Sequence, residues 1–133
     1  MSATPSDRRY TKSHEWVKVE GSELLVGITD HAQSELTDVV FVDLPKAGKA
    51  VGSGEPVLSL ESVKTVADVY APAAGTVVSA NEALKAHPEL VNKDPYGQGW
   101  IYKLKPTGTF DANALMTAQA YDASLASGAA SHH

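Results

Sequence analysis

The sequence predicts a mainly β protein with a few short helices, folded as a flattened barrel or a sandwich. Short runs rich in Val, Ile, Leu and Tyr recur along the 133 residues, and Gly, Pro and Asn separate them. A strand–loop–strand pattern over 39–61 also returns more weakly over 75–105, an offset of about 37 residues. Two similar β-halves around one core favour a barrel or a sandwich.

Seven strands are expected, each bounded by turn residues or proline. They lie at 16–19, 24–28, 38–44, 56–61, 66–70, 76–79 and 100–104. The strands at 56–61 and 66–70 are separated only by Ser62–Thr65, which predicts a hairpin with a short loop. The segment 46–54 contains three glycines and is expected to be a loop.

Three helices are expected, at about 30–36, 81–86 and 111–125. Thr29 or Asp30 can cap the first and Asn81 the second, because their side-chain oxygens accept from backbone N–H groups of the first turn. The C-terminal helix would place four larger side chains along one side, namely Leu115, Met116, Tyr121 and Leu125.

The chain is expected to form one domain over residues 10–125, flanked by flexible tails at 1–9 and 126–133. Its hydrophobic content of 43% argues against disorder. His132 and His133 resemble the remnant of a tag.

The composition argues against several kinds of partner. The net charge is −5 and no cluster of Lys and Arg is visible, so nucleic acid and anionic membranes are poor partners. No apolar run approaches the roughly 20 residues of a membrane span, and the start lacks a secretory signal. A cytoplasmic location is expected, although a mature mitochondrial form would look the same. The absence of cysteine means that any sulfur chemistry must come from a cofactor.

Lys64 is the candidate for covalent modification. It is the only lysine between Lys49 and Lys85, and it lies in the predicted hairpin loop, where a modifying enzyme can reach it. A primary amine on a four-carbon stem suits an amide link to a carrier arm. The alternative is that Lys64 is a solvated surface charge, as most lysines are.

At this point the sequence resembles a known family. Glu61–Lys64 followed by Asp68–Pro72 is similar to the lipoylation segment of the glycine cleavage system H protein family. Four further regions resemble that family in the same order: Tyr10–Val17, Gly27–Gln33, Val40–Pro45, and Glu89–Asn92 with Pro95–Tyr96 and Gly99–Ile101. Thr37 stands where the family usually has Gly, and Thr65–Ala67 replaces a stretch of mostly small residues. The Thr37 change questions the local turn, because Thr disfavours positive φ.

The resemblance implies a lipoyl/biotinyl-type, hammerhead-like fold with lipoic acid attached to Lys64. The modifying enzyme would then recognise Glu61, Ser62 and Val63. By the same resemblance, a groove for the arm and its aminomethyl cargo would be formed by Ser13, Glu15 and Asp68. His31 is expected to pack near a helix start or to help line this groove. A metal role for His14 and His31 is disfavoured, because no third ligand stands at a familiar spacing.

The implied function is non-catalytic transport by a chain that is expected to be a monomer. The arm would accept an aminomethyl group from glycine decarboxylase and deliver it to the aminomethyltransferase, and dihydrolipoamide dehydrogenase would then reoxidise the arm. Lipoate ligase or a lipoyl/octanoyl transferase would attach the cofactor.

Several alternatives stay open. A lipoyl domain of a 2-oxoacid dehydrogenase would resemble Asp-Lys-Ala at the tip, and a biotinyl carrier would have Met beside the lysine, whereas this chain has Val63 and Thr65. An H-like carrier whose main role is to pass lipoyl groups to other proteins is also compatible. An enzyme is disfavoured, because no nucleophile–base or phosphate-loop motif stands out. A plain β interaction module with an unmodified Lys64 is the remaining class.

Overall fold

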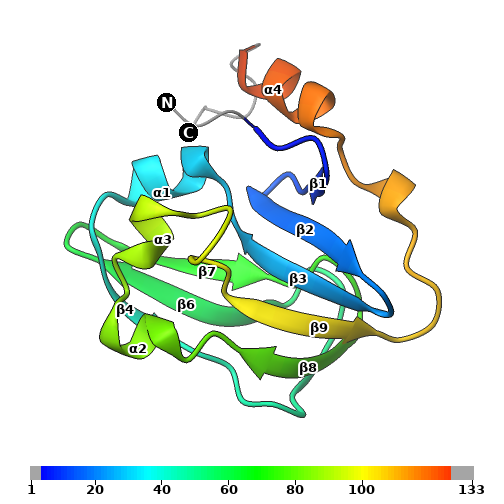
Figure 1. The fold of residues 1–133 in the computed structure, drawn as a ribbon, viewed down its shortest axis with the longest axis horizontal. Helices are drawn as coiled ribbons and strands as arrows, with labels where there is room; N and C mark the ends of the chain where they lie inside the picture. Colours follow the sequence, from blue (N-terminus) through cyan, green and yellow to red (C-terminus); the bar gives the residue numbers. More distant parts are fainter. Residues whose placement is uncertain (1–3, 127–133) are drawn as a thin grey trace.

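Among residues 4–126, the part of the chain that the computed structural model describes, the strands form two antiparallel sheets (Figure 1). The larger has the order β1-β2-β3-β9-β8-β5, with β1 (Arg9–Tyr10), β2 (Glu15–Glu20), β3 (Glu23–Ile28), β9 (Tyr102–Pro106), β8 (Gly75–Ala80) and β5 (Ala50–Val51). The smaller has the order β4-β6-β7, with β4 (Val39–Asp43), β6 (Pro56–Ser62) and β7 (Val66–Tyr70). The predicted mainly β, two-sheet fold is therefore confirmed.

The main core contains inward-facing side chains of both sheets. Val26 and Leu104 come from the larger sheet and Leu60 and Val69 from the smaller, and all four are fully buried. Antiparallel pairing places Leu24 of β3 opposite Leu104 of β9, so the last strand of the chain pairs with one near its start. Burial of these side chains supplies most of the free energy that holds the sheets together.

A second, smaller core lies on the outer face of β1 and β2, beneath the C-terminal helix α4 (Ala118–Ala126) (Figure 1). Its fully buried members are Tyr10, Trp16 and Tyr121, and the rings of Tyr10 and Tyr121 stack with centroids 5.0 Å apart. Because Trp16 and Val17 face opposite sides of β2, both faces of this strand are covered.

The predicted C-terminal helix over 111–125 is wrong at its start. A short 3₁₀ turn occupies Ala112–Ala114, and α4 begins only at Ala118. The cause is an isolated antiparallel β-bridge, in which Tyr10 and Met116 each donate their N–H to the carbonyl of the other at 2.9 Å. This pairing requires extended backbone at Met116, so the helix cannot pass through it.

The predicted helix over 81–86 is shorter than expected, and a second one follows it. The two single-turn helices are α2 (Ala83–Ala86) and α3 (Leu90–Lys93). Asn81 accepts from the Ala83 N–H, and its amide also donates to the carbonyls of Gln98 and Trp100. The Trp100 carbonyl is thus bonded to a side chain. The last strand, predicted from residue 100, begins at Tyr102. The predicted loop at 46–54 also differs, because Ala50 and Val51 pair with β8.

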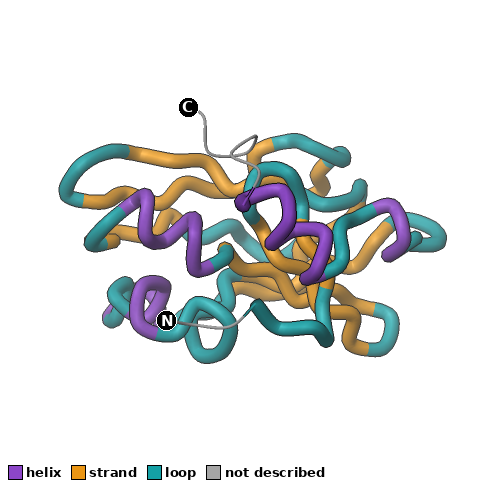
Figure 2. The backbone as a smooth tube through the Cα atoms, turned by 90° about the horizontal axis from the view of Figure 1, so that it is seen from above, coloured by secondary structure: helices purple, strands orange, loops and turns teal. Residues whose placement is uncertain are grey.

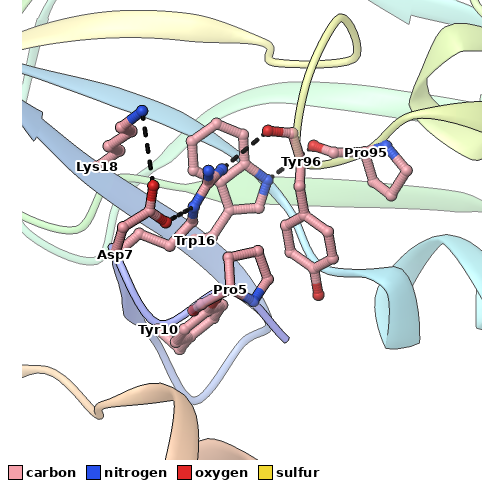
Figure 3. Close-up of polar contacts among 8 residues, drawn as sticks. Pro5, Asp7, Tyr10, Trp16, Lys18, Pro95 and Tyr96 are labelled. Atoms are coloured by element: carbon pink, nitrogen blue, oxygen red, sulfur yellow. Dashed lines mark hydrogen bonds and ion pairs between the residues drawn. The ribbon is translucent and has the colours of Figure 1, made fainter. Parts of the chain in front are cut away.

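Residues 4–9, expected to be a flexible tail, make specific contacts (Figure 3). The Arg8 guanidinium lies 4.5 Å from the Trp16 ring centroid and donates to the Tyr96 carbonyl at 2.9 Å. Its hydrogen bond to Asp7 lowers the pKa of that carboxyl group. The Tyr10 hydroxyl donates to the Pro5 carbonyl at 2.5 Å. The expected tail at 126–133 and the His132–His133 remnant lie outside the described residues, apart from Ala126.

Helix α1 (Asp30–Leu36) is capped by Thr29, whose hydroxyl accepts from the Ala32 N–H at 3.2 Å. It ends at Thr37, which has φ 65° and ψ −148° and donates its N–H to the Gln33 carbonyl. The doubt raised by the missing glycine is therefore justified, because a β-branched residue occupies a left-handed φ.

Thr37→Gly is expected to stabilise the protein. Relief of a strained φ gains about 1–3 kcal/mol, and the greater freedom of glycine in the unfolded chain takes back about 0.5–1 kcal/mol. A net gain of about 1 kcal/mol corresponds to a rise in Tm of about 4 °C, measurable by calorimetry. Thr76→Gly, at an exposed strand position with ordinary φ, should lower Tm instead. An unchanged or lower Tm in Thr37→Gly would show that the backbone at residue 37 is not strained.

Candidate functional site

The predicted hairpin of β6 and β7 is present, with Val63, Lys64 and Thr65 as its loop. The loop projects at one end of the molecule, beside α1, in two views at right angles (Figures 1 and 2). Regular pairing extends to Glu61 and Val66, and the Ser62 N–H then donates to the Thr65 carbonyl at 2.8 Å. The flanking strands are therefore paired up to the base of the loop.

The Ser62 side chain holds this loop from within. Its hydroxyl oxygen accepts from the N–H of Lys64 at 3.2 Å and of Thr65 at 3.0 Å, and its own O–H donates to the Thr65 carbonyl at 3.1 Å. The residue is buried, with 7% of its surface exposed. Sequence reasoning assigned Ser62 a part in recognition by the modifying enzyme, which stays a prediction, and the structure adds that Ser62 shapes the loop.

The amine of Lys64 is accessible. The side chain is exposed, and within the described residues its Nζ makes one hydrogen bond, a long one of 3.5 Å to the Glu35 carbonyl near the end of α1. Within residues 4–126, none of the four ion pairs involves Lys64. A weak contact to a carbonyl leaves the amine free to move, so it does not block acylation.

Exposed apolar side chains surround the lysine. Val63 has 70% of its surface exposed, Val66 59% and Phe41 54%. Phe41 lies opposite Glu61 across β4 and β6, and Glu61 lies opposite Val66 across β6 and β7, so these three side chains form a row on one face of the smaller sheet. An apolar row with a central carboxylate beside an accessible amine suits contact with a partner protein.

The predicted groove residues Ser13 and Glu15 are brought together. Glu15 is fully buried, and its Oε1 accepts from the hydroxyls of Ser13 and Thr11, both at 2.5 Å. Its Oε2 accepts from the Tyr70 N–H at 3.1 Å, which links β2 of the larger sheet to β7 of the smaller. Asp68 lies two residues before Tyr70 on β7 and is exposed, but no hydrogen bond found in the described part of the chain joins it to Glu15.

The predicted groove residue His31 lies beside His14, with ring centroids 4.7 Å apart. His14 has φ 71° and its Nδ1 contacts the Tyr121 hydroxyl at 2.8 Å, and that hydroxyl contacts Thr29 Oγ1 at 2.7 Å. Sequence reasoning left out Tyr121 and Thr29, because they come from α4 and the α1 cap, far apart in the chain. The one earlier signal was the expectation that Tyr121 lies along one side of a C-terminal helix with three other large side chains.

A pH-dependent stability is expected from His14. Burial lowers its pKa from the ordinary value of 6.5, the neighbouring His31 lowers it further, and Glu35 opposes both. The unfolded chain therefore binds a proton to His14 before the folded protein does, so stability is lost as pH falls below about 6.5.

His14→Asn removes this effect and retains a residue that tolerates positive φ. The variant should lose less Tm than the wild type between about pH 7.5 and 5.5, measured by thermal melts at each pH. His87→Asn removes an exposed histidine outside this cluster, together with its ion pair to Glu89, and should not reduce the loss of Tm. An identical pH dependence in all three proteins would contradict the assignment.

No helix within 4–126 is long and apolar enough to cross a membrane. In the same part of the chain, no group of three or more His, Asp or Glu side chains is placed to hold a metal ion.

A two-sheet β fold that presents an exposed lysine on a tightly paired hairpin defines the class of lipoyl-type carrier proteins. Comparison with known proteins agrees and is more specific. The model of the glycine cleavage H-protein family matches residues 8–128. The chain belongs to this family of lipoyl carriers of the glycine cleavage system, as the resemblance in the sequence predicts.

Individual relatives cover almost the whole chain. The glycine cleavage system H protein of Geobacillus kaustophilus is 53% identical over 125 residues, which cover 94% of this chain and 98% of the relative. That of Thermus thermophilus is 54% identical over 123 residues, covering 92% of this chain and 96% of the relative. A crystal structure of the H protein of Mycobacterium marinum matches with a TM-score of 0.82 at 41% identity, covering 92% of this chain and 98% of that one.

Proposed function

We propose that Lys64 carries lipoic acid in an amide bond and that the chain is a non-catalytic shuttle for aminomethyl groups. It would be loaded by glycine decarboxylase, unloaded by the aminomethyltransferase, and reoxidised through dihydrolipoamide dehydrogenase. The observation that carries the proposal is the accessible Lys64 amine on a loop that Ser62 holds in one shape. When bound, a lipoyl group supplies a disulfide that can be reduced and can hold the cargo.

The site fits acylation of the lysine. The amine attacks an activated lipoyl donor in its neutral form, the donor's leaving group departs, and the amide that forms carries no positive charge. Since Lys64 has no ion pair within residues 4–126, no stabilising interaction with a carboxylate is lost in this step. The exposed Glu61 and Val63 are available for recognition by a ligase or a lipoyl/octanoyl transferase, whereas the buried Ser62 acts on the loop itself.

Helix α1 offers a path from the lysine to the proposed groove. The Glu35 carbonyl contacts Lys64 Nζ, and His31 lies four residues earlier, about 6 Å along the helix axis. The His31 ring in turn lies beside the His14 ring, tilted by 41° with centroids 4.7 Å apart, and His14 stands between Ser13 and Glu15 in the chain. An arm that leaves Lys64 and follows α1 therefore reaches hydroxyl and carboxylate oxygens that can accept from an ammonium group.

The groove would shield a bound aminomethyl group from water. Ser13 and Asp68 are the accessible acceptors, because Glu15 already uses both of its oxygens in hydrogen bonds within the protein. Glu15 would then act mainly by orienting the Ser13 hydroxyl. The chain in this proposal binds, positions and protects, while bonds are made and broken in the enzymes that it visits.

The proposal is tested by labelling the purified chain with a lipoate ligase, lipoate and ATP. Intact-mass spectrometry should show the addition of one lipoyl group, and peptide mapping should place it on Lys64. A lipoyl domain known to be a substrate of the same ligase serves as the positive control. If that control is labelled and this chain is not, the carrier function is refuted. If the label lies on another lysine, the assignment of Lys64 as the attachment site is refuted.

A further inference from the structure

Asn92, on α3, holds the backbone that connects α1 to β4. We call this segment, residues 37–39, the Thr37 corner. The Asn92 amide nitrogen donates to the Thr37 carbonyl at 2.6 Å and to Gln33 Oε1 at 3.0 Å, and its oxygen accepts from the Val39 N–H at 2.9 Å. Both N–H groups and the oxygen are therefore in use, which only an amide side chain can provide.

The Thr37 corner needs an external support. Thr37 has φ 65°, a conformation that costs a β-branched residue about 1–3 kcal/mol and persists only where the surroundings impose it. Asn92 bonds to the backbone on both sides of Asp38, at the Thr37 carbonyl and the Val39 N–H. The orientation of the Asp38 peptide is thus set by Asn92.

The Asp38 carbonyl is the group of this corner that contacts the hairpin loop of Val63, Lys64 and Thr65, which we call the carrier loop. It accepts from the N–H of Val63, the residue before Lys64, at 3.1 Å, and Val39 pairs with Ser62 beside it. The pairing of β4 with β6 is interrupted by a bulge between Val39 and Phe41, so this contact is separated from the regular part of the ladder. The Val63 N–H is therefore held from outside the hairpin by the Thr37 corner, while the Lys64 and Thr65 N–H groups are held from within it by Ser62.

We propose that Asn92 is a positioning residue for the carrier lysine, acting through the Thr37 corner and the Val63 N–H. This proposal rests on the proposed attachment of lipoate to Lys64. A loop that is held in advance saves the modifying enzyme the cost of ordering it, so loss of Asn92 should impair modification without any contact to the enzyme being removed.

The test compares Asn92→Ala and Asn92→Asp with the wild type in the full chain. Both variants lose the donated hydrogen bonds, and Asn92→Asp keeps the size and the acceptor for Val39. We expect ligase kcat/KM to fall about tenfold, mainly through KM, and exchange of the Val63 amide to become at least tenfold faster. The amide of Val26, in the other sheet, reports global opening, and its exchange should be accelerated less than that of Val63. Asn113→Ala, at an exposed asparagine of the 3₁₀ turn, is the matched control and should leave both quantities unchanged.

A double-variant cycle separates positioning from general destabilisation. If Ser62→Ala and Asn92→Ala loosen the same loop, their combined effect on ligase kcat/KM is smaller than the product of the single effects. A full product, an unchanged Val63 exchange rate, or kcat/KM equal to that of the wild type would each overturn the proposal. Wild-type chain that takes up no lipoate would instead refute the carrier function, and the Val63 exchange rate would still decide whether Asn92 holds the loop.

Discussion

Lys64→Arg is expected to abolish lipoyl attachment completely while the fold stays intact. Arginine keeps the positive charge, but its guanidinium stays protonated throughout the pH range in which the protein is folded and offers no nucleophilic amine. Lys64 is exposed and has one long hydrogen bond to a backbone carbonyl, so the change in stability should stay within about 0.5 kcal/mol. Intact mass after ligase treatment and a thermal melt measure the two quantities.

The matched control for this substitution is Lys85→Arg. Lys85 is also exposed, on α2, and it forms an ion pair with Glu82 that an arginine can keep. This variant should take up one lipoyl group at the wild-type rate. Labelling of Lys64→Arg to the wild-type extent would mean that another lysine is the attachment site, and the assignment of the hairpin as a carrier loop would be wrong.

Glu15→Ala should produce the largest loss of stability among the polar residues discussed above. Glu15 is fully buried and accepts three hydrogen bonds, from Thr11, Ser13 and the Tyr70 N–H. Removal of the carboxylate leaves the Tyr70 N–H without this acceptor between the two sheets. Unsatisfied buried donors cost about 1–3 kcal/mol each, so a total of about 3 kcal/mol is expected. Chemical denaturation at neutral pH measures it as a lower midpoint with an unchanged slope.

Glu20→Ala is the control for this result. Glu20 ends the same strand, is exposed, and lies opposite Glu23 at the turn, so its loss should change stability by no more than about 0.5 kcal/mol. Equal stability of Glu15→Ala and Glu20→Ala would show that the Glu15 hydrogen bonds contribute nothing net. The structural role of Glu15 would then be rejected.

Local signals in the sequence were sufficient for the carrier hairpin. Two apolar strands separated by four residues are expected to pair with each other as a hairpin with a short loop. The position of Lys64 at the tip therefore follows from the pattern alone. The same holds for the Thr29 cap of α1, because a cap involves residues three positions apart. The unusual backbone at Thr37 was also foreseeable, from the glycine that the family usually has there.

Features that depend on distant pairing were not predictable in this way. The start of α4 is displaced by the bridge of Met116 to Tyr10, and the burial of Glu15 depends on Tyr70, which is 55 positions away. Asn92 looks like an ordinary polar residue of a short helix until Thr37 and Val39 are placed beside it. In each case the partner is chosen by how the two sheets pack and not by neighbouring residues.

The sequence by itself determined a mainly β fold with Lys64 in a hairpin loop, because strand period, turn residues and loop length act over a few residues, and its resemblance to the H-protein family indicated a carrier. Only the tertiary structure decided which distant residues contact the hairpin: Asn92 holds the backbone at Thr37 and Val39, the Asp38 carbonyl accepts from the Val63 N–H, and the Glu35 carbonyl accepts from Lys64 Nζ. It also brought His14 into contact with His31 and Tyr121. These contacts join segments whose separation in the chain carries no local signal, and they form only once the core has brought the segments together.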